Sequence, residues 1–371
     1  MKMICRKCKS KSTVTIRKEY HFCDDCFLSY IDHKFRACLG KSRKLRANEN
    51  VLICLSGGIS SAVLLDLVYH GICLNSHKKL RITPFLLHVT EQLPYDEINK
   101  RSILDQSNKY NFKLNVIDIS HYFNKNTLLS DSHIVTVLPE EIKKWKVCKT
   151  TSCDLLAHMK QNLYIRIAEE LQCRIIFTAE TTTTLAVNLL SDIAKGRGSQ
   201  IENNIGFCDM KNKDAQILRP MRDITIEEVE TYAAIKGIYF TQSKCASNNN
   251  SLQSIIQDFV SGLQENFPAT LTTICKTADK ISSSDSKDKI CMFCKVITIY
   301  TLTRQASKLT AADATHFSSY VSCTKFDVCN PMLNGHLELV TSNQDLCYCC
   351  QRNVLELSST LGDLKNLVIE S

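Results

Sequence analysis

Eight of the chain's 20 cysteines form four C-x-x-C pairs, a spacing that places two thiolates on one metal ion. The two N-terminal pairs are separated by 14 residues, close to the spacing of about 15–20 found in four-cysteine zinc modules. Because such a site is closed to substrate, the pattern predicts a structural zinc held by Cys5, Cys8, Cys23 and Cys26. The alternative is two unrelated redox or surface pairs.

The two C-terminal pairs predict a second zinc site, although 52 residues separate Cys294 from Cys347. Its expected ligands are Cys291, Cys294, Cys347 and Cys350, with Cys323, Cys329 or Cys349 as possible substitutes. The alternative is a set of redox or buried cysteines. We interpret the 12 cysteines outside the pairs as small buried hydrophobic residues.

A glycine-containing turn is the second candidate site. The segment Ser56-Gly57-Gly58-Ile59-Ser60-Ser61 follows a continuous apolar run, Val51–Leu55, and leads into a helical pattern. Glycines at a strand-to-helix turn let backbone N–H groups approach an anion, and the helix N-terminus adds partial positive charge. No lysine follows the glycines, so this is not a Walker A loop; taken alone, it could also be a plain tight turn.

The composition indicates a globular protein of two or three domains, with 371 residues, 44% hydrophobic and 23% charged. No apolar run approaches the roughly 18 residues that span a bilayer, and charged residues occupy the N-terminus where a signal peptide would be apolar. We therefore expect a cytoplasmic protein with no membrane association.

The positive charge is concentrated at the N-terminus. Residues 1–46 hold 13 basic and four acidic side chains, which gives a charge of +9 and, because the net charge of the whole chain is +8, leaves −1 for the rest of the chain.

Three regions are expected to position these residues. Residues 1–46 form a basic zinc-ribbon-like module, with a strand at 13–17 and a helix over 27–36. Residues 47–281 alternate short apolar strands with helices, which favours a parallel α/β sheet. Its strands are predicted at 51–55, 82–89, 114–119 and 174–178, and its helices at 59–69, 95–110, 151–171, 225–236, 252–265 and 268–280. Residues 282–371 form a polar linker and a cysteine-rich module with a helix from Val354.

The segment Ser56–Ser61 resembles the S-G-G-x-D-S loop of the PP-loop ATP pyrophosphatases. Those enzymes adenylate a substrate with ATP, and the resemblance implies an adenine nucleotide alpha hydrolase-like fold flanked by the zinc modules. Further segments are similar to tRNA-thiolating members, namely Lys195–Gly198, Arg219–Glu228, Phe267–Ile274 and Leu346–Arg352. Together they identify the chain as a member of the cytoplasmic tRNA 2-thiolation protein 2 family.

That resemblance implies a partner subunit. It would support a catalytic paralogue, cytoplasmic tRNA 2-thiolation protein 1, in making 2-thiouridine at wobble position U34 of Lys, Glu and Gln tRNAs. A ubiquitin-related modifier would donate the sulfur, indirectly for this chain. tRNA phosphates would be contacted by Lys34, Arg36, Lys41, Arg43, Lys44, Arg46, Lys195 and Arg197. The aromatic residues among these charges are expected to form the module's core rather than to stack on bases.

Three departures from the family pattern indicate a decayed active site, so we assign no catalytic residue. Ser60 replaces the loop aspartate, which leaves ATP binding and turnover open. The segment from Thr178 has no histidine and no paired carboxylates where the catalytic paralogue has T-G-H-N-x-D-D. The central cysteines Cys148 and Cys153 are spaced C-x4-C instead of C-x-x-C. Two alternatives remain: an ATP-dependent tRNA sulfurtransferase active by itself, and a zinc-ribbon RNA-binding protein outside thiolation.

Overall fold

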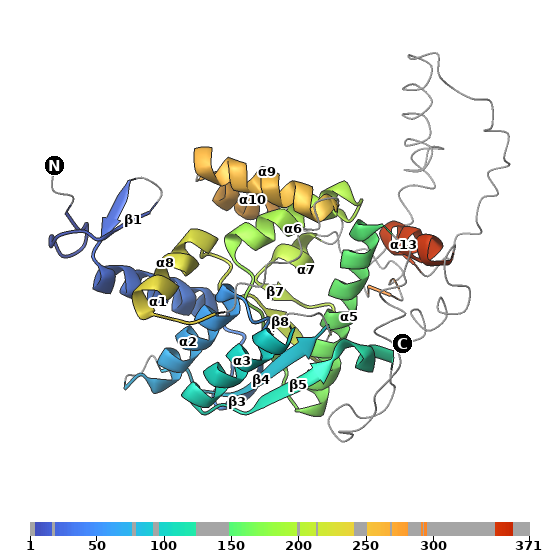
Figure 1. Ribbon diagram of the computed structural model, residues 1–371, viewed down its shortest axis with the longest axis horizontal. Coiled ribbons are helices and arrows are strands. Elements are labelled where there is room, and N and C mark those ends of the chain that lie inside the picture. Colours follow the sequence, from blue (N-terminus) through green and yellow to red (C-terminus); the bar gives the residue numbers. More distant parts are fainter. Residues whose placement is uncertain are drawn as a thin grey trace, which may run out of the picture.

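The computed structural model describes residues 4–16, 19–75, 79–91, 96–123, 148–198, 201–212, 214–240, 251–267, 269–280, 291, 293–294 and 346–358. These residues form an N-terminal hairpin, a central six-stranded sheet with helices on both faces, and a C-terminal helix beside the sheet domain (Figure 1). No helix in this part of the chain is both long enough and apolar enough to span a lipid bilayer.

The central sheet has the strand order β5-β4-β3-β6-β8-β7. Its strands are β3 Glu49–Cys54, β4 Ile82–Thr90, β5 Leu114–Asp118, β6 Ile175–Phe177, β7 Cys208–Asp209 and β8 Gln216–Leu218. All neighbouring pairs are parallel except β7–β8, which confirms the predicted parallel α/β sheet. The connections leave β3 in opposite directions, so the carboxyl ends of β3 and β6 flank the switch point where such sheets bind ligands.

Both faces of the sheet are covered, which explains why β3 is a continuous apolar run. Val51, Ile53 and Leu55 face a core that includes side chains of α1, α2, α3 and α8, whereas Leu52 and Cys54 face α5 and the short 3-10 helix η1. The bounds are α1 Asp24–Ser42, α2 Ile59–Cys73, α3 Asp96–Tyr110, η1 Ile119–Phe123, α5 Lys149–Glu170 and α8 Ile226–Lys236. The five α-helices among these were predicted and are confirmed, with differences of up to six residues at their ends, whereas η1 was not predicted.

A third apolar core lies between four further helices. These are α6 Thr182–Ala194, α7 Ile201–Ile205, α9 Leu252–Asn266 and α10 Thr270–Ala278. Helices α9 and α10 lie across α6 at one end of the domain (Figure 1). The predicted helices over 252–265 and 268–280 are thus confirmed, and they belong to this separate helical layer.

The N-terminal module consists of a hairpin followed by a helix. Strand β1, Val14–Ile16, pairs antiparallel with β2, Tyr20–Phe22, and α1 follows directly. Phe22, Phe27 and Phe35 are buried, as expected of core aromatic residues, whereas Tyr20 is 37% exposed. Lys34 of α1 donates to both carboxylate oxygens of Glu228 on α8 at 2.7 Å, so α1 docks onto the sheet domain.

The C-terminal helix α13 spans Tyr348–Ser358 and packs on α5. The sequence prediction started this helix at Val354, six residues too late. The C-x-x-C pattern at its start obscured the beginning of the helix, because Cys347 precedes α13 directly and Cys350 lies in its first turn. The helix therefore presents one cysteine pair from its own N-terminus.

Candidate metal centres and a buried polar pocket

The N-terminal cysteines gather where the hairpin meets α1. Their four Sγ atoms lie within 4.8 Å of one another, and Cys8 Sγ is 3.5 Å from Cys23 Sγ. Cys5 and Cys8 lie in the turn before β1, whereas Cys23 caps the N-terminus of α1 and Cys26 follows in its first turn. The β1–β2 hairpin thus carries the second pair back beside the first, as the sequence predicted.

The geometry of this cluster fits a single tetrahedral ion. Zn–S bonds of about 2.3 Å place neighbouring sulfurs about 3.8 Å apart, close to the separation of Cys8 and Cys23. A backbone N–H from Cys8 to the sulfur of Cys5 lowers the pKa of Cys5 to about 6, so this thiol ionises readily. Metal binding requires thiolates, and this group could hold one metal ion.

The second cluster joins cysteines from distant parts of the sequence. Cys291, Cys294, Cys347 and Cys350 also have their Sγ atoms within 4.8 Å of one another. Cys294 Sγ lies 3.6 Å from Cys347 Sγ, and the backbone N–H of Cys347 donates to Cys291 Sγ at 3.2 Å. The Cys294 thiol donates to Cys291 and lowers the pKa of Cys291 well below its usual range. The predicted split site is therefore assembled as a group that could hold a second ion.

The C-terminal cluster is anchored to α5 by neighbouring side chains. Glu356 of α13 accepts a hydrogen bond from Thr151 Oγ1 at 2.6 Å and another from the backbone N–H of Cys148. One turn further along α5, the Cys349 thiol lies 3.7 Å from Asp154 Oδ2. The ring of Phe293 packs edge-on against His158, with centroids 5.3 Å apart. Successive turns of α5 therefore pack against the residues that surround the C-terminal cysteine cluster.

The Ser-Gly-Gly turn lies at the carboxyl end of β3 and leads directly into α2. Gly57 has φ 85°, a left-handed conformation that favours glycine, and Gly58 is the N-cap of α2. Ser61 Oγ donates to the Gly58 carbonyl at 2.8 Å and fixes the turn. Ser60 is half-buried in the first turn of α2 and presents a hydroxyl where the family loop has a carboxylate. The turn exposes a helix N-terminus suited to an anion, and ATP binding there stays a prediction.

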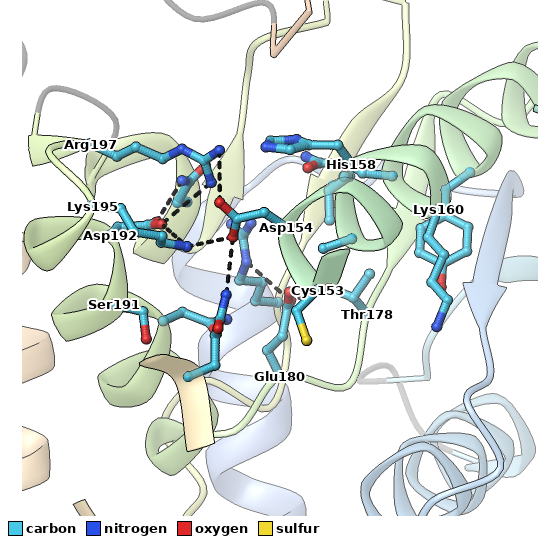
Figure 2. A pocket seen from close by; sticks show the side chains of 18 residues that line it. Cys153, Asp154, His158, Lys160, Thr178, Glu180, Ser191, Asp192, Lys195 and Arg197 are labelled. Carbon is cyan, nitrogen blue, oxygen red and sulfur yellow. Dashed lines mark hydrogen bonds and ion pairs between the residues drawn. The ribbon is translucent and has the colours of Figure 1, made fainter. Parts of the chain in front are cut away.

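A pocket of about 330 Å³ lies between α5, α6 and β8. Figure 2 shows Asp154 at its centre, with Lys195 and Arg197 converging on it. Lys195 Nζ lies 2.7 Å from Asp154 Oδ1, and Arg197 Nη2 lies 3.2 Å from Asp154 Oδ2. Asp192 lies 3.4 Å from Lys195 and 3.9 Å from Arg197. Two cations and two carboxylates thus form one buried network.

Burial and charge oppose each other at Asp154. Burial raises the pKa of its carboxyl, but Arg197 and Lys195 outweigh this effect and hold the pKa below its usual range. On the neighbouring turn, burial and then the positive charge of Arg197 lower the pKa of His158 to about 3. Asp154 is therefore charged and His158 neutral at pH 7.

The eight predicted tRNA-contacting side chains have different surroundings. Lys41, Arg43 and Arg46 are exposed at and just beyond the end of α1. Lys34 is paired with Glu228, Arg36 donates to the Asp32 carbonyl, and Lys44 Nζ lies 3.4 Å from the sulfur of Met210. The side chains of Lys195 and Arg197 are only 10% and 5% exposed, inside the network with Asp154. The accessible basic surface of this set therefore centres on Lys41, Arg43 and Arg46.

The two central cysteines occupy different positions on α5. Cys148 is the exposed N-cap of the helix and accepts a hydrogen bond from the backbone N–H of Thr151, whereas Cys153 is half-buried and lines the pocket.

Across the pocket, Glu180 lies 3.1 Å from Arg219 Nε. Asp154, His158, Asp192 and Glu180 line this pocket and were not predicted from the sequence. A carboxylate on an otherwise apolar helix face, as at Asp154 and Asp192, is the signal that could have indicated the buried network.

Known proteins resemble both the sequence and the fold. The family model for cytoplasmic tRNA 2-thiolation protein 2 matches residues 251–352. The protein of that name from Aedes aegypti is 33% identical over 303 residues, covering 76% of this chain and 66% of the relative. The Drosophila melanogaster protein is 30% identical over 307 residues, covering 78% and 76%. The chain thus spans about two thirds to three quarters of the length of these relatives.

Among solved structures, the fold is similar to that of the U34-tRNA thiolase NcsA from Methanococcus maripaludis, a structure that contains a 4Fe-4S cluster. The TM-score is 0.62 at 19% identity, covering 76% of this chain and 88% of the thiolase. At this identity the likeness concerns the fold alone, and it agrees with the parallel α/β architecture predicted for the central domain. With the sequence identity to the insect proteins, these findings show that the chain belongs to the cytoplasmic tRNA 2-thiolation protein 2 family.

Proposed function

We propose that this chain acts in tRNA thiolation in the cytoplasm, as a tRNA-binding subunit that supports a catalytic PP-loop paralogue. The expected product is 2-thiouridine at U34 of Lys, Glu and Gln tRNAs, with sulfur from a ubiquitin-related modifier. Family membership supports the pathway. The observation that supports a non-catalytic role is Ser60, which leaves the turn at the end of β3 without the family's carboxylate.

The chemistry of the turn explains why this replacement matters. Adenylation releases pyrophosphate as its magnesium complex, and an aspartate beside the phosphates helps to hold that divalent ion. The hydroxyl of Ser60 cannot supply a negative charge. The backbone N–H groups at Gly58 and the start of α2 remain suited to an anion, so the turn retains phosphate-binding features while lacking a group for turnover.

We further propose that each four-cysteine cluster holds a structural zinc ion. Four thiolates around a tetrahedral site select zinc or iron, and sulfurs within 4.8 Å fit one ion better than a four-iron cluster, whose thiolates bind separate irons. The zinc modules would occupy residues 1–46 and 282–371, on either side of the PP-loop domain at 47–281. Metal analysis of the purified chain should give about two zinc ions, and less than one would contradict the proposal.

Measurement of wobble 2-thiouridine by mass spectrometry in cells lacking the protein tests the pathway. Loss of the modification is expected, and an unchanged level would remove the thiolation role. A pyrophosphate-release assay with purified chain, ATP and tRNA separates the subunit role from the alternative of an active sulfurtransferase. Robust turnover without a partner would favour that alternative.

The tRNA contact is tested by replacing the exposed cations Lys41, Arg43 and Arg46 with alanine. Each lost phosphate contact lowers the slope of log affinity against log salt by about 0.7–0.9, so the triple variant should lose about two slope units. A matched control replaces Arg101, Lys109 and Lys113, which are exposed on α3 and just beyond it. Equal slopes for both variants would reject the α1 end as a tRNA contact.

A further inference from the structure

The pocket is lined by six buried polar atoms without a hydrogen-bond partner among the described residues, and two of them, Arg197 Nη2 and Arg219 Nε, lie in ion pairs with carboxylates. The other four are Arg197 Nε, Ser191 Oγ, His158 Nε2 and Gln253 Oε1. All four side chains line the pocket, and Arg197 and Ser191 are more than nine-tenths buried. Buried polar groups left unpaired are costly, so such a convergence indicates a bound molecule that completes their hydrogen bonds.

The charge balance of the pocket determines which kind of molecule fits. Lys195 and Arg197 are paired with Asp154 and Asp192, and Arg219 is paired with Glu180. Lys160 at the rim is paired with Glu91. The three carboxylates that line the pocket would repel an oxyanion. The lysine and arginine side chains paired with those carboxylates would repel a metal cation. The paired charges therefore favour a neutral ligand.

The unpartnered atoms also specify hydrogen-bonding character. Arg197 Nε can only donate and Gln253 Oε1 can only accept, whereas Ser191 Oγ and a neutral His158 can do either. A ligand that satisfies them must carry both hydrogen-bond donors and acceptors. The His158 ring, one turn after Asp154 on α5, lies beside the Arg197–Asp154 pair (Figure 2), and the aromatic ring of Tyr164 also lines the pocket. Aromatic walls favour a planar ring.

We propose that this pocket binds a neutral nucleobase, presented by an unpaired nucleotide of RNA. A nucleobase is planar and uncharged, and its edge alternates donors and acceptors. A volume of about 330 Å³ accepts a nucleoside-sized group. The inference rests on the proposed tRNA-binding function, which supplies the RNA, and it assigns a base-binding site in addition to the exposed cations at the end of α1.

The test uses the full chain and free nucleosides, so that binding at the pocket is measured without tRNA. Uridine, cytidine, adenosine and guanosine are titrated separately by calorimetry, with inorganic phosphate as the anionic probe. Binding of at least one nucleoside and no binding of phosphate at the pocket is expected. Binding of phosphate alone, or of no nucleoside at about 10 mM, would overturn the inference.

Two variants locate the binding. Ala157 is exposed on α5 and lines the pocket, so Ala157→Phe should block it and weaken nucleoside binding at least tenfold. Ala234→Phe, at an exposed alanine of α8 that does not line the pocket, is the matched control and should bind as the parent does. Ser191→Ala removes one unpartnered hydroxyl and should weaken binding about fivefold. Equal affinities for both phenylalanine variants would place the nucleoside elsewhere and reject the pocket.

The outcomes for the pocket and for the proposed function are distinguishable. If the chain binds tRNA with the salt dependence expected for the α1 end but Ala157→Phe binds nucleosides unchanged, the pocket inference fails and the tRNA-binding role stands. If nucleosides bind and Ala157→Phe abolishes this, while tRNA does not bind, the pocket is supported as a nucleoside site and the tRNA role fails.

Discussion

Replacing Asp154 with asparagine should destabilise the protein more than any exposed ion pair does. The carboxylate has two cationic partners, Lys195 at 2.7 Å and Arg197 at 3.2 Å, and all three side chains are at most 10% exposed. Removing one partner of a buried pair leaves charge unpaired in a poorly solvated site, which costs about 3–5 kcal/mol. Asp192 stays within 3.4 Å and 3.9 Å of the two cations, so we expect the lower value, about 3 kcal/mol.

Urea unfolding followed by circular dichroism measures this loss. The matched control is Asp279→Asn, since Asp279 pairs with Arg222 at 2.6 Å but its side chain is 42% exposed. An exposed pair contributes at most about 1 kcal/mol. If Asp154→Asn costs no more than the control, the buried network does not hold α5 against the segment that follows α6, and the reasoning is wrong.

Three further predictions concern the C-terminal cysteine cluster, the pH dependence of stability and backbone conformation. Cys350→Ser should increase amide hydrogen exchange in α13 and in the first turns of α5, because Glu356 and Phe293 contact side chains of α5. Unchanged hydrogen exchange would contradict this anchoring. The folded-state pKa of His158 is about 3, below its unfolded value of roughly 6.5. At pH values between these two pKa values, the unfolded chain therefore binds more protons than the folded chain. Stability should therefore fall by about 2 kcal/mol from pH 7 to pH 5, and His158→Gln should abolish this part of the pH dependence of urea unfolding. Gly237→Ala should destabilise the protein by about 1 kcal/mol, because φ at Gly237 is 59°. Gly40→Ala should stabilise the protein by about 0.5–1 kcal/mol, because Gly40 lies within α1 with open space around it. Equal shifts in melting temperature for the two variants would refute this reasoning.

Much of the fold could be predicted because the signals are local. The apolar run at β3 predicts a strand covered on both faces, and Ser56–Ser61 predicts the turn into α2. Helix α8 has a capping box, with Thr225 at the N-cap and Glu228 three residues later, and Gly237 at its end. The two-residue strand β7 and the three-residue strand β8 were not predicted, because pairing with neighbours rather than an apolar run defines them.

The sequence by itself predicted which cysteines could hold a metal ion, and it showed the altered Ser-Gly-Gly turn. Thiolates two residues apart can bind one ion wherever the chain places them, and the missing aspartate at Ser60 is visible without coordinates. Tertiary structure decided which cysteines meet, since Cys294 and Cys347 are distant in the sequence but lie together in the apolar core that includes α5.

Tertiary structure also decided the surroundings of Lys195 and Arg197. In the sequence they belong to a basic, glycine-containing segment suited to RNA phosphates, but Asp154, 41 residues before Lys195, lies against both of them. A cation's accessibility depends on whether a carboxylate from another helix shares its buried site. Local spacing determines what a side chain can bind, and only the packing of α5 against the segment after α6 decides what it does bind.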